Sequence, residues 1–104
     1  MKNEDLDFSK LNGFDWDNGN TGHIKKHNVD TRECEEVFLN KPFILNNDET
    51  HSQIEKRFRV YGQTDQNRRL MLIFTIRKGK IRVISARDQN KKECKEFQEI
   101  GGES

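Results

Sequence analysis

Three side chains in this sequence could transfer a proton near neutral pH, namely His27, His51 and Glu55. Imidazole exchanges protons in that range, and a carboxylate can serve as a base where neighbouring cations tune it. Each also has a structural alternative. A charged His27 would be favourable at the C-terminal end of a helix, and Glu55 could form a weak surface ion pair with Arg57 or Arg59. The sequence leaves open which of the three would act as acid or base.

Arginine and lysine side chains along the chain could hold a phosphodiester. Arginine presents paired donors that match two phosphate oxygens, so it is the better residue for gripping a phosphate. The residues expected at the scissile phosphate are Arg57, Arg82 and Arg87, and those expected to bind or steer the rest of a polyanion are Lys26, His51, Arg59 and Lys80. As an alternative, Arg82 and Arg87 could be ordinary charges on a strand edge.

These residue types are sufficient to cleave RNA without a metal ion. The 2′-hydroxyl attacks the phosphate, so the protein must remove its proton, neutralise the charge on the phosphorane and protonate the leaving 5′ oxygen. A serine nucleophile at Ser85 is disfavoured because no histidine stands at a useful spacing in the sequence. The sequence has no C-x-x-C motif and its three histidines are scattered, so we expect neither a metal site nor another cofactor.

The charge of the chain is distributed unevenly. From Lys56 to Lys95 there are thirteen basic and three acidic residues, a charge of +10, whereas the rest of the chain carries −9. Such an asymmetry points to a polyanionic partner. It is equally compatible with a solvated sheet face, or with a non-catalytic module that docks RNA or an acidic protein.

Length and composition indicate one small folded domain spanning residues 1–104, with its core at about residues 14–97 and loose ends. Leu, Ile, Val and Phe make up 25 of the 104 residues and the net charge is only +1, which argues against disorder. No apolar run is long enough to cross a membrane, and the N-terminus is acidic where a signal peptide would be basic and then apolar. We therefore expect a cytoplasmic protein with no membrane partner.

Three helices are predicted from spacing and capping residues. The first spans residues 18–27, with Asn28 in a left-handed ending. The second follows a capping box of Asp30 with Glu33 and stops before Asn40. Asn90 with Glu93 caps the third. The two cysteines, at positions 34 and 94, lie on the apolar stripes of the second and third helices and are read as buried free thiols.

Four strands are predicted between the second and third helices, at residues 42–45, 57–62, 70–77 and 80–87, with a polar loop at 46–52. In the second strand Arg57, Arg59 and Tyr61 alternate with core residues. The third and fourth flank a two-residue hairpin turn at Lys78 and Gly79.

In the fourth strand, strict alternation places Ile81, Val83, Ser85 and Arg87 on one face, and Arg82, Ile84 and Ala86 on the other. The fold class is therefore α+β: two helices, a mainly antiparallel four-stranded sheet and a last helix, with the helices on one face of the sheet.

Five short motifs, in order and at fixed spacing, resemble the BrnT family of toxins. They are Phe14-Asp15-Trp16-Asp17, Lys26-His27-Asn28-Val29, Glu36-Val37-Phe38, His51-Ser52 with Glu55 and Arg57, and Ile81-Arg82-Val83-Ile84-Ser85-Ala86-Arg87. No single motif is specific, but the ordered set is. It lies within residues 14–97, which is 84 of 104 residues.

The resemblance implies a RelE-like fold and metal-independent cleavage of RNA in a type II toxin-antitoxin system. It also implies neutralisation by a BrnA-like antitoxin with a ribbon-helix-helix part, so that DNA is contacted only indirectly, through the antitoxin. The chain departs from the family pattern at three positions. His23 stands where the family usually has Asn, Asn28 where it has Gly, and Phe97 where a late tyrosine is common, so no role for that hydroxyl carries over.

Overall fold

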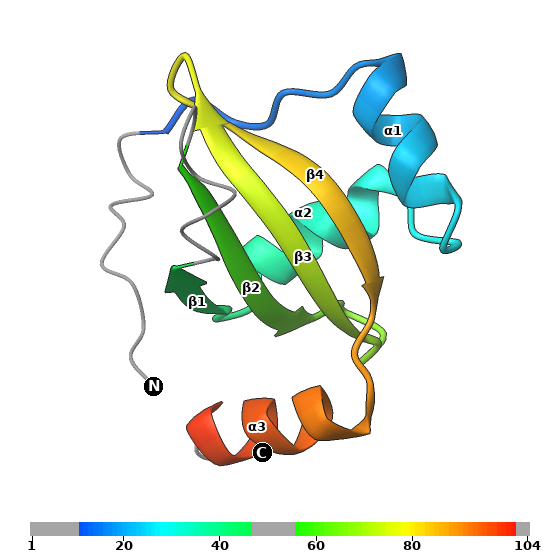
Figure 1. Ribbon diagram of the computed structural model, residues 1–104, viewed down its shortest axis with the longest axis vertical. Helices are drawn as coiled ribbons and strands as arrows, with labels where there is room; N and C mark the ends of the chain where they lie inside the picture. Colours follow the sequence, from blue (N-terminus) through cyan, green and yellow to red (C-terminus); the bar gives the residue numbers. More distant parts are fainter. Residues whose placement is uncertain (1–10, 47–55, 102–104) are drawn as a thin grey trace.

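The structure is a computed structural model that describes residues 11–46 and 56–101. Within this part of the chain, two helices precede a four-stranded sheet and one helix follows it, as predicted (Figure 1). In chain order the elements are α1 (Asn18–Lys25), α2 (Thr31–Leu39), β1 (Phe43–Asn46), β2 (Arg57–Gln63), β3 (Arg69–Arg77), β4 (Lys80–Asp88) and α3 (Lys91–Gly101). Each strand lies within one residue of its predicted bounds.

The helices begin where side-chain acceptors satisfy their first backbone N–H groups. Asp17 caps α1, which ends at Lys25, two residues earlier than predicted, and Asn28 then takes the left-handed conformation with φ of 58°. The predicted capping box of α2 is confirmed, because Asp30 and Glu33 exchange hydrogen bonds.

The predicted start of α3 is also confirmed. Asn90 Oδ1 accepts from the Glu93 backbone at 2.8 Å, and the Asn90 N–H donates to Glu93 Oε1 at 2.9 Å. This reciprocal pair fixes the entry of the chain from β4 into the helix.

The strands form one antiparallel sheet in the order β1-β2-β3-β4. The predicted hairpin turn joins β3 to β4, with φ of 54° at Lys78 and 78° at Gly79. Two consecutive positive φ values are those of the primed turns that match strand twist.

A β-bulge in β4 overturns the predicted facing of that strand. Ser85 pairs with Ile73, whereas the next residue of β3, Phe74, pairs with Val83, so Ile84 is the extra residue. The extra residue reverses the alternation beyond it. Ala86 therefore joins Val83 in the core, whereas Ser85 and Arg87 face outward with Arg82.

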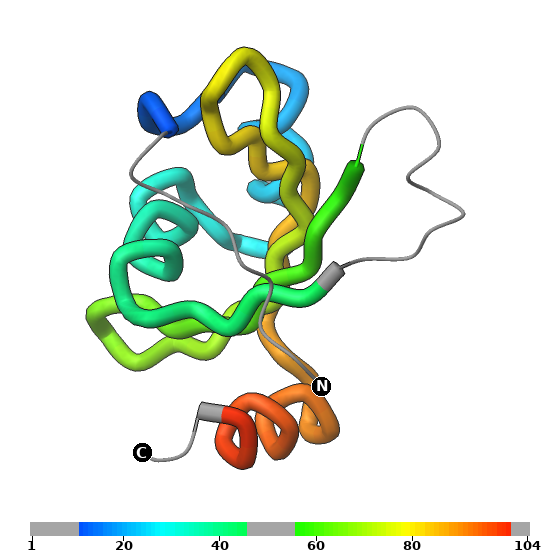
Figure 2. The backbone as a smooth tube through the Cα atoms, turned by 90° about the vertical axis from the view of Figure 1, so that its left-hand side faces the viewer, coloured from blue at the N-terminus to red at the C-terminus, as the bar shows by residue number. Residues whose placement is uncertain are grey.

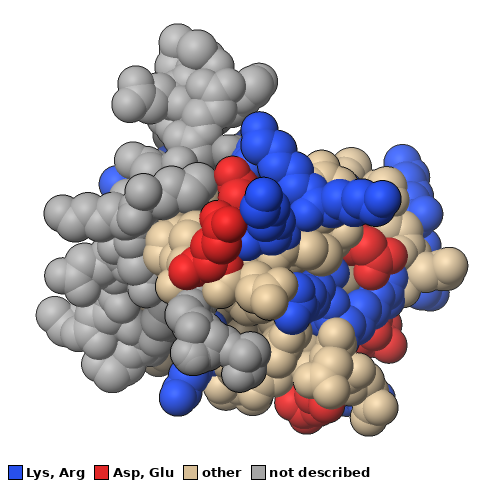
Figure 3. Space-filling model, turned by 90° about the horizontal axis from the view of Figure 1, so that it is seen from below, with Lys and Arg blue, Asp and Glu red and all other residues tan. Residues whose placement is uncertain are grey.

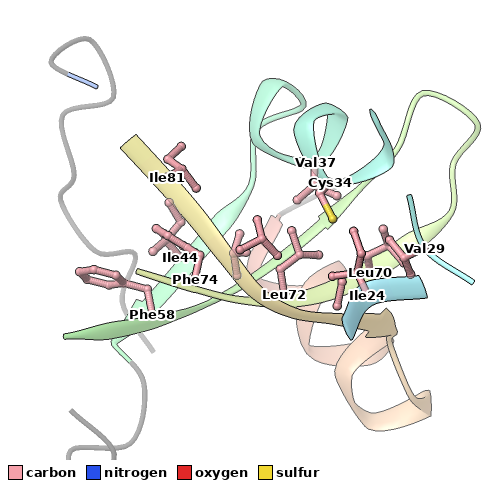
Figure 4. Close-up of a cluster of buried hydrophobic side chains, with 13 residues drawn as sticks. Ile24, Val29, Cys34, Val37, Ile44, Phe58, Leu70, Leu72, Phe74 and Ile81 are labelled. Atoms are coloured by element: carbon pink, nitrogen blue, oxygen red, sulfur yellow. The ribbon is translucent and has the colours of Figure 1, made fainter. Parts of the chain in front are cut away.

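A hydrophobic core fills the space between α2 and the sheet. Cys34 and Val37 of α2 are fully buried and share one core cluster with Leu72, Phe74 and other strand residues (Figure 4). Both cysteines are free thiols as predicted, although Cys94 is only half-buried. Burial raises the pKa of the Cys34 thiol to about 12, because an apolar site disfavours the thiolate.

The third helix does not join the other helices on that face, contrary to our expectation. α2 lies against one side of the sheet and α3 beyond its lower end (Figure 2). Tyr61, which faces away from the core, is 1% exposed and donates from its hydroxyl to Glu96 of α3 at 3.0 Å. The outward face of β2 is therefore covered by α3 at one end.

The segment before α1 extends the sheet beyond β4. Phe14 forms an isolated parallel bridge with Ile81, and the Asp15 N–H donates to the Ile81 carbonyl at 2.8 Å. Phe14 and Trp16 pack against the core as predicted, and the Trp16 indole N–H donates to Glu35 of α2. This docking places α1 alongside β4.

Some expectations fall outside the described residues, namely those for His51, Glu55, most of the 46–52 loop and the two chain ends. Among the helices that the structure describes, none is both long and apolar enough to cross a membrane.

Candidate functional site

The outward face of the sheet carries four of the predicted phosphate-binding arginines. Strand register places Arg57 and Arg82 in one row across Thr75, with Arg59 in the next row along β2 and Arg87 further along β4. We call these four residues the arginine face. The bulge in β4 is what creates this set, because strict alternation would have put Arg82 and Arg87 on opposite faces.

Arg82 is held by two carboxylates of the segment before α1. Its guanidinium contacts both oxygens of Asp17, with Nη2 to Oδ1 at 3.1 Å and Nη1 to Oδ2 at 3.0 Å, and lies 3.5 Å from Asp15. The hydrogen bond from Arg82 is the largest cause that lowers the pKa of Asp17. Since Asp17 also caps α1, this pair fixes the guanidinium relative to the start of the helix.

Arg87 is paired with α3. Its two terminal nitrogens donate to the two oxygens of Glu93 at 2.7 and 2.9 Å. This bidentate pair lowers the pKa of Glu93, chiefly through the hydrogen bonds, and raises that of Arg87. The geometry holds α3 onto the end of the arginine face.

Sequence reasoning did not find a role for Tyr61, and the structure places its hydroxyl at the junction of the arginine face with α3. Burial is the main cause that raises its pKa, and the nearby Arg59 opposes that shift. Phe97, which stands where the family often has tyrosine, lies under the Arg69 guanidinium at 5.8 Å. Tyr61 is the hydroxyl-bearing ring near this helix among the described residues.

Arg68 is a second residue that sequence reasoning missed. It donates to Glu33 of α2, to Asp88 at the end of β4, and to the backbone carbonyls of His27 and Asn28. It therefore joins the turn after α1 to two other elements. In the sequence, the one signal that pointed to Arg68 was its position within the basic segment at residues 56–95.

The predicted proton-transfer residue His27 lies at the other end of α1 from Arg82. Its side chain is exposed, and its positive form is one of the smaller causes that lower the pKa of Asp88, after Arg68. His27 is thus close to Asp88 and Arg68 rather than to the row of Arg57 and Arg82. Lys26 and Lys80 are exposed, at the end of α1 and the start of β4.

Residues 16–93 match the family described as ribonuclease toxin, BrnT, of type II toxin-antitoxin system. The chain belongs to the BrnT family. No curated protein matches this sequence.

Membership of the BrnT family makes this chain a ribonuclease toxin whose partner is an antitoxin. The matched residues include α1, α2, the whole sheet and Glu93 of α3, so the arginine face lies inside the family region. Among the described residues, no group of three or more His, Cys, Asp and Glu side chains is placed to hold a metal ion.

Proposed function

We propose that this BrnT-family chain is an endoribonuclease that binds RNA across the arginine face and cleaves it by attack of the 2′-hydroxyl, without a metal ion. The observation that carries the proposal is the β4 bulge, which puts Arg87 on the same side of the sheet as Arg57, Arg59 and Arg82. Guanidinium groups on a common surface can bind successive phosphates and neutralise the charge that develops on one of them.

The proton-transfer residues of this proposal are His27, His51 and Glu55, as the sequence suggested. Of these three residues, His27 lies in the described part of the chain. Its side chain is exposed after α1 and lies near Asp88 at the end of β4.

Cleavage of purified RNA in EDTA tests the proposal. We expect products with 2′,3′-cyclic phosphate and 5′-hydroxyl ends, formed at the same rate with and without the chelator. Loss of one well-placed charged donor typically lowers the rate by about 100-fold or more, so Arg57→Gln and His27→Ala should each cleave far more slowly. Lys92→Ala is the control, since it removes an exposed positive charge of α3 outside the arginine face.

Each alternative has its own outcome in this assay. RNA that stays intact while still bound would identify a non-catalytic module, and cleavage abolished by EDTA would refute the metal-independent mechanism. Thermal melting of every variant separates a lost catalytic group from a lost fold.

We further propose that the antitoxin is a BrnA-like protein with a ribbon-helix-helix part that binds DNA. Expression of the chain alone should arrest growth, and co-expression with the protein encoded beside it should restore growth and yield a complex on copurification. Growth arrest that persists in the presence of the neighbouring protein would contradict this assignment.

A further inference from the structure

A shallow hollow of about 170 Å³ lies between α1 and β4, at the border of the arginine face. It is lined by Gly19, Asn20, His23, Arg82 and Ile84. We propose that this hollow binds one unpaired base of the RNA substrate, an inference that rests on the proposed ribonuclease function. Its volume corresponds to about six water molecules, which suits a single base rather than a length of strand.

The lining side chains have the chemistry that recognises an unstacked base. RNA-binding proteins stack such bases on aromatic rings, histidine included, and on arginine guanidinium planes. His23 is exposed on α1 beside Arg82, and Ile84 supplies an apolar surface because the bulge turns it out of the core. Arg82 directs N–H groups to Asp17 and towards Asp15, so at most two of its five N–H groups remain for a base edge.

The local charge favours a base over a phosphate in this hollow. Asp15 and Asp17 both lie against Arg82, so this cluster of three groups has a net charge of −1. A phosphate that approaches Arg82 must displace these carboxylates, whereas a neutral base need not. Arg57 is two strands away from Arg82, about 10 Å between backbones, where a neighbouring phosphate could be held.

The wall of the hollow is fixed by hydrogen bonds within the fold. The Asn20 side chain donates to the carbonyls of Asp15 and Val83 and accepts from the Asp17 N–H, so its polar atoms are used internally. Asn20 therefore shapes the hollow, and His23 and Arg82 are left to contact the base. A preformed site of this kind costs little ordering when the base enters.

The test uses RNA oligonucleotides that differ at one position beside the cleavage site. The wild-type protein should prefer one base there. His23→Ala should lower kcat/KM on the preferred RNA by about tenfold or more and abolish the preference, while His23→Phe, which keeps a stacking ring, should retain it. An unchanged preference in His23→Ala would overturn the proposal, as would a defect only in antitoxin binding.

Two glycines of α1 provide a matched pair of variants. A Cβ at Gly19 would lie 3.2 Å from Asp17 Oδ1 and 3.9 Å from Arg82 Nη2, whereas one at Gly22 would meet nothing within 4 Å. Gly19→Ala should therefore weaken the base preference and Gly22→Ala should not; the same result in both would count against the hollow.

Failure of the proposed function gives a different result from failure of this inference. If the wild-type protein cleaves none of the RNAs, cleavage is refuted, and binding of the same oligonucleotides, measured by fluorescence anisotropy, still tests the hollow. Equal affinity for all four bases, or no effect of His23→Ala on a measured preference, would overturn the inference alone.

Discussion

The bidentate pair between Arg87 and Glu93 gives a prediction about stability that the structure makes quantitative. The Glu93 side chain is 7% exposed and that of Arg87 is 36% exposed, so the pair is partly screened. Glu93→Gln removes the charge but keeps an oxygen that can accept from the Asn90 N–H, which leaves the capping interaction of α3 in place. The change therefore isolates the ion pair.

Two hydrogen bonds to a charged group contribute about 1.5 to 3 kcal/mol each when fully formed. Glutamine retains part of this stabilisation, and solvent already weakens the ion pair in the wild type. We therefore expect the free energy of unfolding to fall by about 2 kcal/mol. For a chain of this size that corresponds to a decrease in Tm of about 10 °C. Glu99→Gln, an exposed change on the same helix, should leave Tm almost unchanged.

The same pair predicts a dependence on pH. The ion pair lowers the pKa of Glu93 below its usual 4.5 in the folded state. Its stabilisation is therefore complete above that value and is lost as the pH falls through the folded-state pKa. The stability difference between wild type and Glu93→Gln should be largest at pH 7 and shrink under acid conditions. Urea unfolding at several pH values measures it, and a difference that stays constant would refute the reasoning.

Three further predictions concern other contacts of the fold. Gly62→Ala should destabilise the protein by about 1 to 3 kcal/mol in urea unfolding, because its Cβ would lie 2.6 Å from Val37 Cγ1, and an unchanged midpoint would contradict this. Cys34, with its pKa of about 12, should resist alkylation in the native protein at pH 8 and react on unfolding, as peptide mapping would show. Arg68→Lys should lower stability by about 2 kcal/mol, since one ammonium cannot replace its contacts to Glu33, Asp88 and the turn after α1.

The elements of this fold could be predicted from the sequence because their signals are local. Asp30 with Glu33, and Asn90 with Glu93, stand three residues apart, and each pair caps the helix that follows it. The turn at Gly79 needs a residue that accepts positive φ, and glycine does so without cost. In each case the residues that decide the structure are neighbours in the chain.

The facing of β4 could not be predicted in the same way. Ile84 continues a regular alternation of side chains, and nothing in the residues around it marks the extra position. With the bulge, Ala86 pairs with Leu72 and is fully buried while Ser85 is only half-buried, an arrangement that involves packing against β3 and not neighbours in the chain. The sequence therefore predicted which arginines could bind phosphate, but not that Arg82 and Arg87 lie on the same face of the sheet.

The contrast between the basic block and the acidic remainder has a structural meaning that the charge count could not show. Arg82 is paired with Asp17, 65 residues earlier in the chain, and Arg68 with Glu33, 35 residues earlier. Acidic side chains also lie among the basic ones on the surface near α3 (Figure 3). Several residues of the basic block thus form ion pairs that join separate parts of the chain. A phosphate that binds Arg82 or Arg87 must compete with the carboxylate already paired with that arginine. If binding depends on that competition, Glu93→Gln should bind RNA more tightly than the wild type even as it loses stability, whereas a simple loss of fold would weaken both.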